Sequence, residues 1–210
     1  MKIYLNSYRP LVHNRAGRTA VQKYGIPPFV DASCRREPDF EAEFPSITAL
    51  CRFRHFAPRL HEKDVAVYLT VKRQYSGCSE QHWRLTALLQ VIKRFENHER
   101  AAEWYRSAGL PLPSNCMVEG NAPVALDRTD RFHPSLDSWD RLYRNKARRC
   151  SVFLACRSLF RELNNPPVVT EAIMVRSFGY TPATRTPPTV PVEPVQRLIA
   201  EAGVDLTLPV

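Results

Sequence analysis

Two stretches of alternating apolar and polar residues constrain the fold of this chain more than any other feature. The first, DVAVYLTVK at 64–72, places four side chains on one face: Val65, Val67, Leu69 and Val71. After a loop with Gly77, the run HWRLTALLQVIKRF at 82–95 repeats the pattern with Trp83, Leu85, Ala87, Leu89 and Val91. A period of two residues indicates a strand with one side in a core. We predict two consecutive strands, followed by a helix that Asn97 caps and Gly109 ends.

The rest of the chain mixes strand and helix patterns, which predicts an α+β protein. We expect one main domain over 1–178, with a Pro-rich strap and a closing helix over 179–210. Within the main domain the patterns predict an opening strand at Ile3, a long loop insertion at 9–45, a short helix at 46–52, a loop at 114–134, a basic helix at 136–149, a strand at 151–156, a short helix at 158–163 and a late strand at 166–178.

The charge of the chain favours a polyanionic partner. The net charge is +9 with a pI near 9.5, and residues 1–36 contain seven Lys or Arg against a single acid, Asp31. A balance of this kind is typical of nucleic-acid-binding proteins, although many soluble proteins are also basic. The apolar runs are too short to span a bilayer and the N-terminus lacks a signal-peptide pattern, so we expect a cytoplasmic protein with no membrane partner.

Most enzyme signatures are missing from the sequence. It has no GxxxxGK[ST], GxGxxG or GxSxG motif, and no HxE followed by PCxxC. The six cysteines form no CxxC pair, which argues against a zinc ribbon, and we expect them to be reduced and mostly buried. We therefore expect no cofactor and no metal.

The strongest candidate site is the run from Asp31 to Asp39, DASCRREPD. Its two adjacent guanidiniums, Arg35 and Arg36, suit a phosphate or a carboxylate. The acids and the hydroxyl of the run could bond to a base edge: Asp31, Ser33, Glu37 and Asp39. Arg charge beside Cys34 could instead activate its thiol. The alternative is an Arg–carboxylate network that only fixes an irregular loop.

Three further groups are candidates for contact with nucleic acid. Ser114 and Asn115 follow a Pro-rich turn and could form a pocket floor, or simply cap that turn. Tyr68 and Trp83 could stack on a base, although Trp83 alternates with the core residues of its strand. On the basic helix, three residues could contact phosphates or form an ordinary solvated face: Arg141, Arg144 and Arg148.

The segments FAPRLHEKDVAVYLTVK (56–72) and HWRLTALLQVIKRFENHERAAEWY (82–105) resemble the PUA-like superfamily, which includes EVE, ASCH and YTH domains. Asp64 matches the aspartate at the end of a tight turn, and Lys63 stands where the family usually has Gly. The upstream runs PPFVDASCRREP and SITALCRFRHFAPRL are similar to nucleotide-modification-associated domains of bacteria and phages. This resemblance, over about 27–105, implies a small twisted β-barrel with flanking helices and a groove for a nucleotide, often a modified one.

These observations favour a nucleic-acid-binding protein that recognises a modified or flipped base without catalysis, with DNA favoured over RNA as partner. One alternative is an enzyme of base or nucleotide modification that uses Cys34 or the Glu37 and Asp39 carboxylates. Another is an interaction module for an acidic protein. The oligomeric state is left open by the sequence.

Overall fold

The strands of this protein form one mixed sheet in a computed structural model that describes residues 1–125, 135–184 and 186–209. The strand order is β2-β5-β4-β3-β1-β7, and β6 pairs with β4. β1 and β3 run parallel, and the other pairs are antiparallel. The strands are β1 Ile3–Tyr8, β2 Ser46–Thr48, β3 Val65–Thr70, β4 Trp83–Phe95, β5 Phe153–Arg161, β6 Val168–Val169 and β7 Thr189–Val190. The α+β class is confirmed, but the described strands do not close into the expected barrel.

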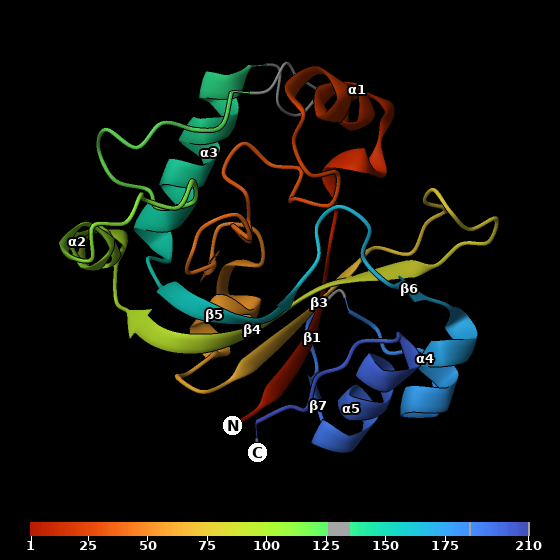
Figure 1. Cartoon of the computed structure of the whole chain (residues 1–210). Helices are drawn as coiled ribbons and strands as arrows, with labels where there is room; N and C mark the ends of the chain where they lie inside the picture. The colour runs from red at the N-terminus through yellow and green to blue at the C-terminus, as the bar shows by residue number, and fades with distance from the viewer. Residues whose placement is uncertain (126–134, 185, 210) are drawn as a thin grey trace.

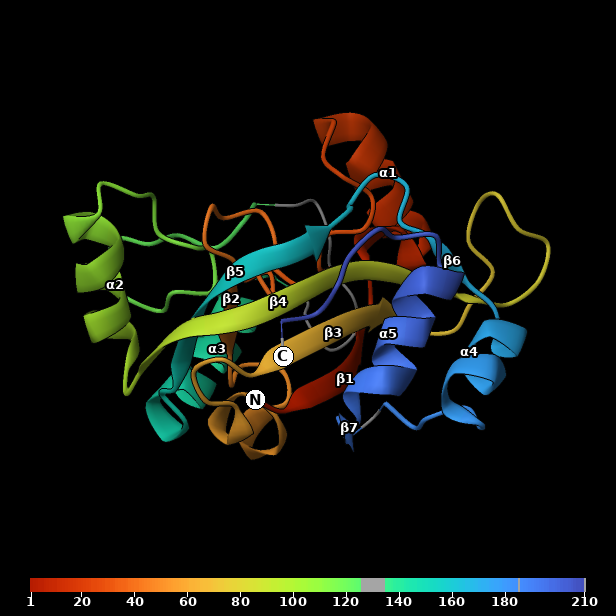
Figure 2. The same ribbon diagram turned by 60° about the horizontal axis from the view of Figure 1, so that its bottom comes forward.

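Helices cover both faces of the sheet (Figure 1). α4 (Glu171–Phe178) and α5 (Val192–Glu201) lie on one face, and α1 (Arg15–Tyr24) and α3 (Leu136–Arg149) lie on the other. Figure 2 shows α5 crossing in front of β1 and β3. α2 (His98–Ser107) follows β4 and packs beside the end of β4 and the start of β5. Within the described residues, no helix has the length and apolar character needed to cross a membrane.

The two alternating runs form β3 and β4 as predicted, but both of their faces are buried. Val65, Val67 and Leu69 pack with α5, whereas Ala66 and Tyr68 face the opposite core. In β4, the register against β3 shifts between Leu85 and Ala87, and this breaks the single expected face. Trp83, Leu85 and Leu88 therefore join the α5 side, while Ala87, Leu89 and Val91 join the other. A bulge places an extra residue in one strand, and this reverses the side on which later residues point.

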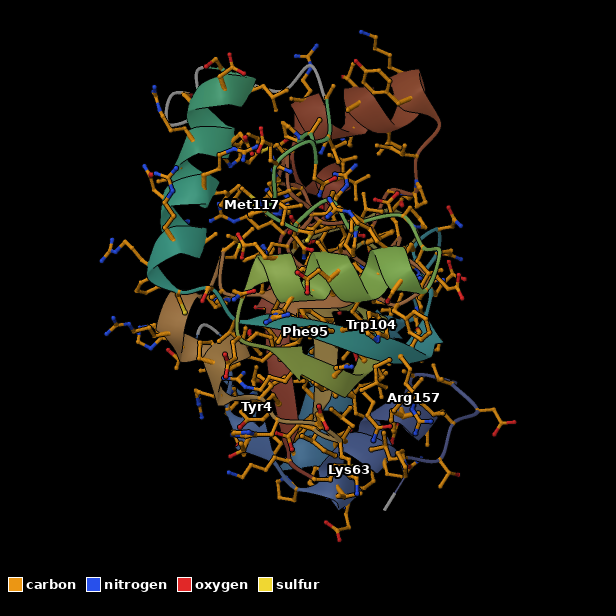
Figure 3. The ribbon with its side chains drawn as sticks, turned by 90° about the vertical axis from the view of Figure 1, so that its left-hand side faces the viewer. Tyr4, Lys63, Phe95, Trp104, Met117 and Arg157 are labelled. Atoms are coloured by element: carbon orange, nitrogen blue, oxygen red, sulfur yellow. The ribbon has the colours of Figure 1, made fainter. Side chains whose placement is uncertain are left out.

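The turn into β3 places a lysine in a left-handed backbone conformation. Lys63, labelled in Figure 3, has a φ of 72°, in the left-handed region that favours glycine. Asp64 accepts hydrogen bonds from the backbone nitrogens of Lys2 at 2.7 Å and His61 at 3.0 Å, so it ties this turn to β1. Lys63 thus adopts the conformation that glycine usually provides.

Several helix predictions are confirmed by their caps. Asn97 and Ser135 cap α2 and α3 through their side chains, and α5 is the closing helix predicted within 179–210. The helix predicted at 46–52 is wrong, because Ser46–Thr48 pairs with β5. The helix predicted at 158–163 is wrong, because β5 continues to Arg161.

Three other expectations need correction. The late strand at 166–178 is only the two-residue β6, because Thr170 caps α4 and Gly179 ends it. The long loop at 9–45 contains α1, and the Pro-rich strap contains β7, which pairs with β1. Of the loop expected at 114–134, residues 126–134 lie outside the described part of the chain.

Candidate functional site

A cavity of about 730 Å³ lies on the sheet face opposite α4 and α5. Asn6, Tyr8 and Tyr68 line it from the carboxyl-terminal halves of the parallel strands β1 and β3. Trp139 and Tyr143 line it from α3, and further lining residues come from the segments at 31–38 and 51–56. Its volume falls within the range of about 300–1,000 Å³ that small-molecule sites occupy.

Aromatic side chains form much of the cavity wall. Tyr68 meets Tyr8 and Phe56 edge to face, with ring centroids 6.2 and 6.1 Å apart. Trp139 and Tyr143 are tilted by 34° with centroids 6.4 Å apart. Rings packed against one another are rigid, and rigid aromatic surfaces suit the faces of a planar ligand such as a base.

Asp31 places a fixed carboxylate in this cavity. Its Oδ1 accepts three hydrogen bonds, from the Ser33 nitrogen at 2.8 Å, the Ser33 hydroxyl at 2.5 Å and the Glu37 nitrogen at 2.9 Å. Burial raises the pKa of Asp31, while these hydrogen bonds and the nearby Arg36 charge oppose the rise. Within the described residues no donor bonds to Oδ2, so one oxygen is held by the loop and the other has no donor among them.

Glu37 is the second acid of the cavity, and its oxygens are held by the protein. The Thr48 nitrogen donates to Oε1 at 2.9 Å, and Oε2 contacts the Thr48 hydroxyl and accepts from Asn115 Nδ2 at 3.1 Å. Burial raises the pKa of Glu37 to about 8, and the charge of Asp31 adds to this rise. Glu37 is therefore mostly protonated at neutral pH.

Asn6 is a polar lining residue that the sequence reasoning missed. It is 4% exposed and lies beside Tyr68 across the β1–β3 pair. Its Oδ1 is buried without a hydrogen-bond partner among the residues described. The signal was present in the sequence, because asparagine is disfavoured inside strands and IYLNSY is otherwise rich in strand formers.

Arg35 and Arg36 are used within the protein. Arg35 is fully buried; its Nε donates to Asp140 at 2.5 Å, and its Nη1 donates to the carbonyls of Ser114 and Asn121, each at 3.0 Å. Arg36 donates to the carbonyl of Asp31 and to Glu41. This arrangement is the loop-fixing network considered from the sequence, and neither residue lines the cavity.

Asn115 and Ser114 also serve this network from behind the cavity. Asn115 is fully buried and bonds to Glu37 and Ser46. Ser114 donates twice to Asp39 Oδ2, at 2.6 Å from its nitrogen and 2.8 Å from its hydroxyl. Asp39 is absent from the cavity lining, and its other oxygen caps the backbone of Glu41. Ser114, Asn115 and Asp39 therefore hold Glu37 and the 31–39 segment in place without lining the cavity themselves.

Cys34 lies outside the cavity lining and packs among apolar side chains, including Leu50 and Met117. Burial raises the pKa of the Cys34 thiol to about 12, and the nearby Asp140 charge adds to the rise. A thiol in this state is a poor nucleophile at neutral pH. The structure therefore gives no support to the expectation of a reactive Cys34.

Tyr68 and Trp83, predicted together as stacking residues, lie on opposite faces of the sheet. Tyr68 lines the cavity, whereas Trp83 packs in the core beneath α4 and α5, with Lys72 4.9 Å from its ring centroid. The packing alternative considered for Trp83 is the arrangement found.

The basic helix α3 brings its charges beside the cavity. Tyr143 and Trp139 point inward from the helix, and Arg141 and Arg148 are exposed on its surface. Arg144 instead pairs with Asp140 at 2.8 Å, four residues earlier. Arg9 and Arg52 are further basic residues of the cavity lining. Positive charge therefore lies next to an aromatic cavity.

Comparisons with family models, curated proteins and solved structures gave no match. Within the described residues, no three side chains among His, Cys, Asp and Glu gather as a metal site. The candidate site is therefore defined by its own geometry, which combines aromatic walls, two acids and one unpartnered amide oxygen.

Proposed function

We propose that this protein binds nucleic acid and holds one base, flipped or modified, in the cavity between β1, β3 and α3, without transforming it. The observation that carries the proposal is the cavity itself, where Tyr8, Tyr68 and Tyr143 surround a space that also contains Asp31 and Asn6. Proteins that recognise a base outside a duplex stack aromatic side chains on its faces. They also place a few polar groups against its edge. The resemblance of residues 27–105 to nucleotide-modification-associated and PUA-like domains supports the same proposal.

The charge around the cavity supports a nucleic acid rather than an isolated base. Exposed Arg141 and Arg148 on α3 and Arg9 at the cavity provide cations for phosphates on either side of a bound nucleotide. Contacts of this kind make affinity fall as salt rises, because binding releases counterions from the phosphates. DNA is the proposed partner.

The proposal is tested by equilibrium binding to single- and double-stranded DNA and RNA, with and without modified bases, at two salt concentrations. Ala32 lines the cavity and is half-buried, so Ala32→Trp fills the cavity; Ala108→Trp, on the exposed end of α2, is the matched control. We expect Ala32→Trp to abolish base preference while the control retains it. Absence of salt-dependent affinity for any nucleic acid contradicts the proposal, and unselective competition by polyanions favours an acidic protein partner instead.

One observation favours an enzyme as the second candidate. Asp31 and Glu37 share the cavity, burial raises the pKa of both, and paired acids with shifted pKa values are a common basis for acid–base catalysis. This version of the enzyme hypothesis uses Glu37, not Cys34 or Asp39. Replacement of Glu37 by Gln distinguishes the candidates, because a reader keeps its base preference, whereas an enzyme loses turnover with its affinity largely retained.

A further inference from the structure

We infer that the base held in this cavity is a guanine or a guanine derivative, whose 2-amino group donates to Asn6 Oδ1 and whose N1–H donates to Asp31 Oδ2. This inference rests on the proposed function, because it names the base that the cavity selects.

The first observation is the unpartnered oxygen of Asn6. A buried carbonyl oxygen without a donor destabilises the folded state, so such atoms are rare in folded proteins. Asn6 is held in register beside Tyr68 by the β1–β3 ladder, which keeps its side chain at the cavity. A ligand that brings an N–H group to this oxygen removes the cost on binding.

The second observation is the orientation of Asp31. Three donors, from Ser33 and the Glu37 backbone, are all directed at Oδ1. They fix which oxygen faces the loop, so Oδ2 remains as an acceptor without a donor from any described residue. Asp31 and Asn6 line the same cavity from different segments of the chain.

The third observation is that other polar groups of the cavity are already engaged. The hydroxyl of Tyr8 bonds to the Phe29 carbonyl, and the Arg52 guanidinium donates to the Ser7 carbonyl at 2.5 Å. Both Glu37 oxygens are bonded to Thr48. Asn6 Oδ1 and Asp31 Oδ2 are both acceptors to which no described residue donates, so a ligand that bonds to them must supply donors.

Among the common bases, only guanine carries two neighbouring N–H donors on its base-pairing edge. Adenine and cytosine place one amino donor beside a ring acceptor, and uracil and thymine place one imino donor between two carbonyls. A site built to accept two hydrogen bonds discriminates strongly against a base that lacks one of them, because a buried acceptor is then left unpaired.

The test measures affinity for single-stranded oligothymidylates that carry one central guanine, hypoxanthine, adenine, cytosine or uracil. Hypoxanthine is guanine without the 2-amino group, so the comparison requires no change to the protein. We expect guanine to bind best and hypoxanthine about tenfold more weakly, as the loss of one hydrogen bond predicts.

Two variants assign the acceptors. Asn6→Leu removes the oxygen, and we expect it to fold and to bind guanine and hypoxanthine equally; Asn164→Leu, at an exposed position, is the control. Asp31→Asn places an amide nitrogen at the Oδ2 position, because the three donors hold the oxygen at Oδ1, so we expect guanine binding to fall at least about tenfold.

If the wild type binds all five oligonucleotides with equal affinity and Ala32→Trp abolishes this binding, the guanine inference is overturned and the proposed function stands. Absence of binding by any strand overturns the proposed function and the inference together. A guanine preference that Asn6→Leu and Asp31→Asn both leave unchanged, in variants that unfold cooperatively, overturns the assignment of these two residues.

Discussion

The two faces of the central sheet use the same strands but bury different chemistry. The face beneath α4 and α5 packs apolar side chains, such as Leu5, Val67 and Leu198. The opposite face contains a cavity and the buried polar residues Asn6, Asp31 and Glu37. Burial of polar groups costs stability unless every group is bonded, so a face that served only stability would be apolar. We propose that one face mainly stabilises the fold and that the other holds the ligand.

The layers of this arrangement are visible from the side in Figure 3, where the C-terminal helices lie below the sheet and α1 and α3 lie above it. If the two faces have separate roles, substitutions on them should separate stability from binding.

The largest expected loss of stability comes from the buried pair behind the cavity. Asp140→Ala leaves the Arg35 charge fully buried without its carboxylate, so we expect the free energy of unfolding to fall by about 3–5 kcal/mol. Denaturant unfolding measures it. Glu103→Ala, which removes the exposed pair with Arg100, is the control and should be close to wild type. If Asp140→Ala and Glu103→Ala changed the free energy of unfolding equally, the Arg35–Asp140 pair would not have the structural role given to it here.

The next largest effect tests the apolar face. Leu198 on α5 is fully buried, and Leu198→Ala should lower the free energy of unfolding by about 2–5 kcal/mol through loss of burial and a new cavity. At temperatures where the variant remains folded, its affinity and base preference for nucleic acid should equal those of wild type. A changed base preference would contradict the separation of the two faces.

A smaller effect is the pH dependence caused by Glu37. Its pKa rises from an ordinary 4.5 to about 8 on folding, so the folded protein retains a proton that the unfolded chain has lost. The free energy of unfolding should therefore fall as pH rises toward 8, by up to about 1.4 kcal/mol per pH unit. Glu37→Gln should remove this slope, as measured by denaturant unfolding.

The clearest range for this measurement is between about pH 6.5 and 8. Below it His98 acts in the opposite direction, because burial lowers the pKa of His98 from 6.5 to about 4 and an unfolded histidine then binds the proton. Identical slopes for wild type and Glu37→Gln within this range would contradict the assignment to Glu37.

The smallest effect concerns the α3 surface beside the cavity. Arg148→Ala should weaken binding to all DNA sequences similarly and lower the slope of log affinity against log salt by about one, as for loss of one phosphate contact. Arg100→Ala, exposed on α2, is the matched control. A change in base preference rather than in salt slope would place Arg148 in base recognition.

Local patterns in the sequence identified much of the fold. The alternation in β3 and β4 and the caps at Asn97 and Ser135 depend on neighbouring residues, and these elements were predicted correctly. β2 was mistaken for a helix because its pairing with β5 joins residues that are distant in sequence. The bulges of β4 are likewise set by the partner strand, so the sequence alone could not predict which side chains share a face.

The site was predicted only in part for the same reason. Asp31, Ser33 and Tyr68 were identified and line the cavity, but Arg35 and Ser114 belong to the network behind it. Whether an arginine faces a ligand or a buried carboxylate depends on Asp140, which lies 105 residues away in sequence. Asn6 could have been found, because an amide inside a buried strand breaks the local pattern.

The most direct test of the central claim is photocrosslinking with single-stranded DNA that contains 6-thioguanine, which retains the N1–H and 2-amino groups. Mass spectrometry then locates the crosslinked residue. The account predicts crosslinks to cavity aromatics such as Tyr68 or Tyr143, and their loss in Ala32→Trp. Crosslinks confined to the outer surface of α3, and equal in Ala32→Trp, would contradict the claim that the cavity holds a base.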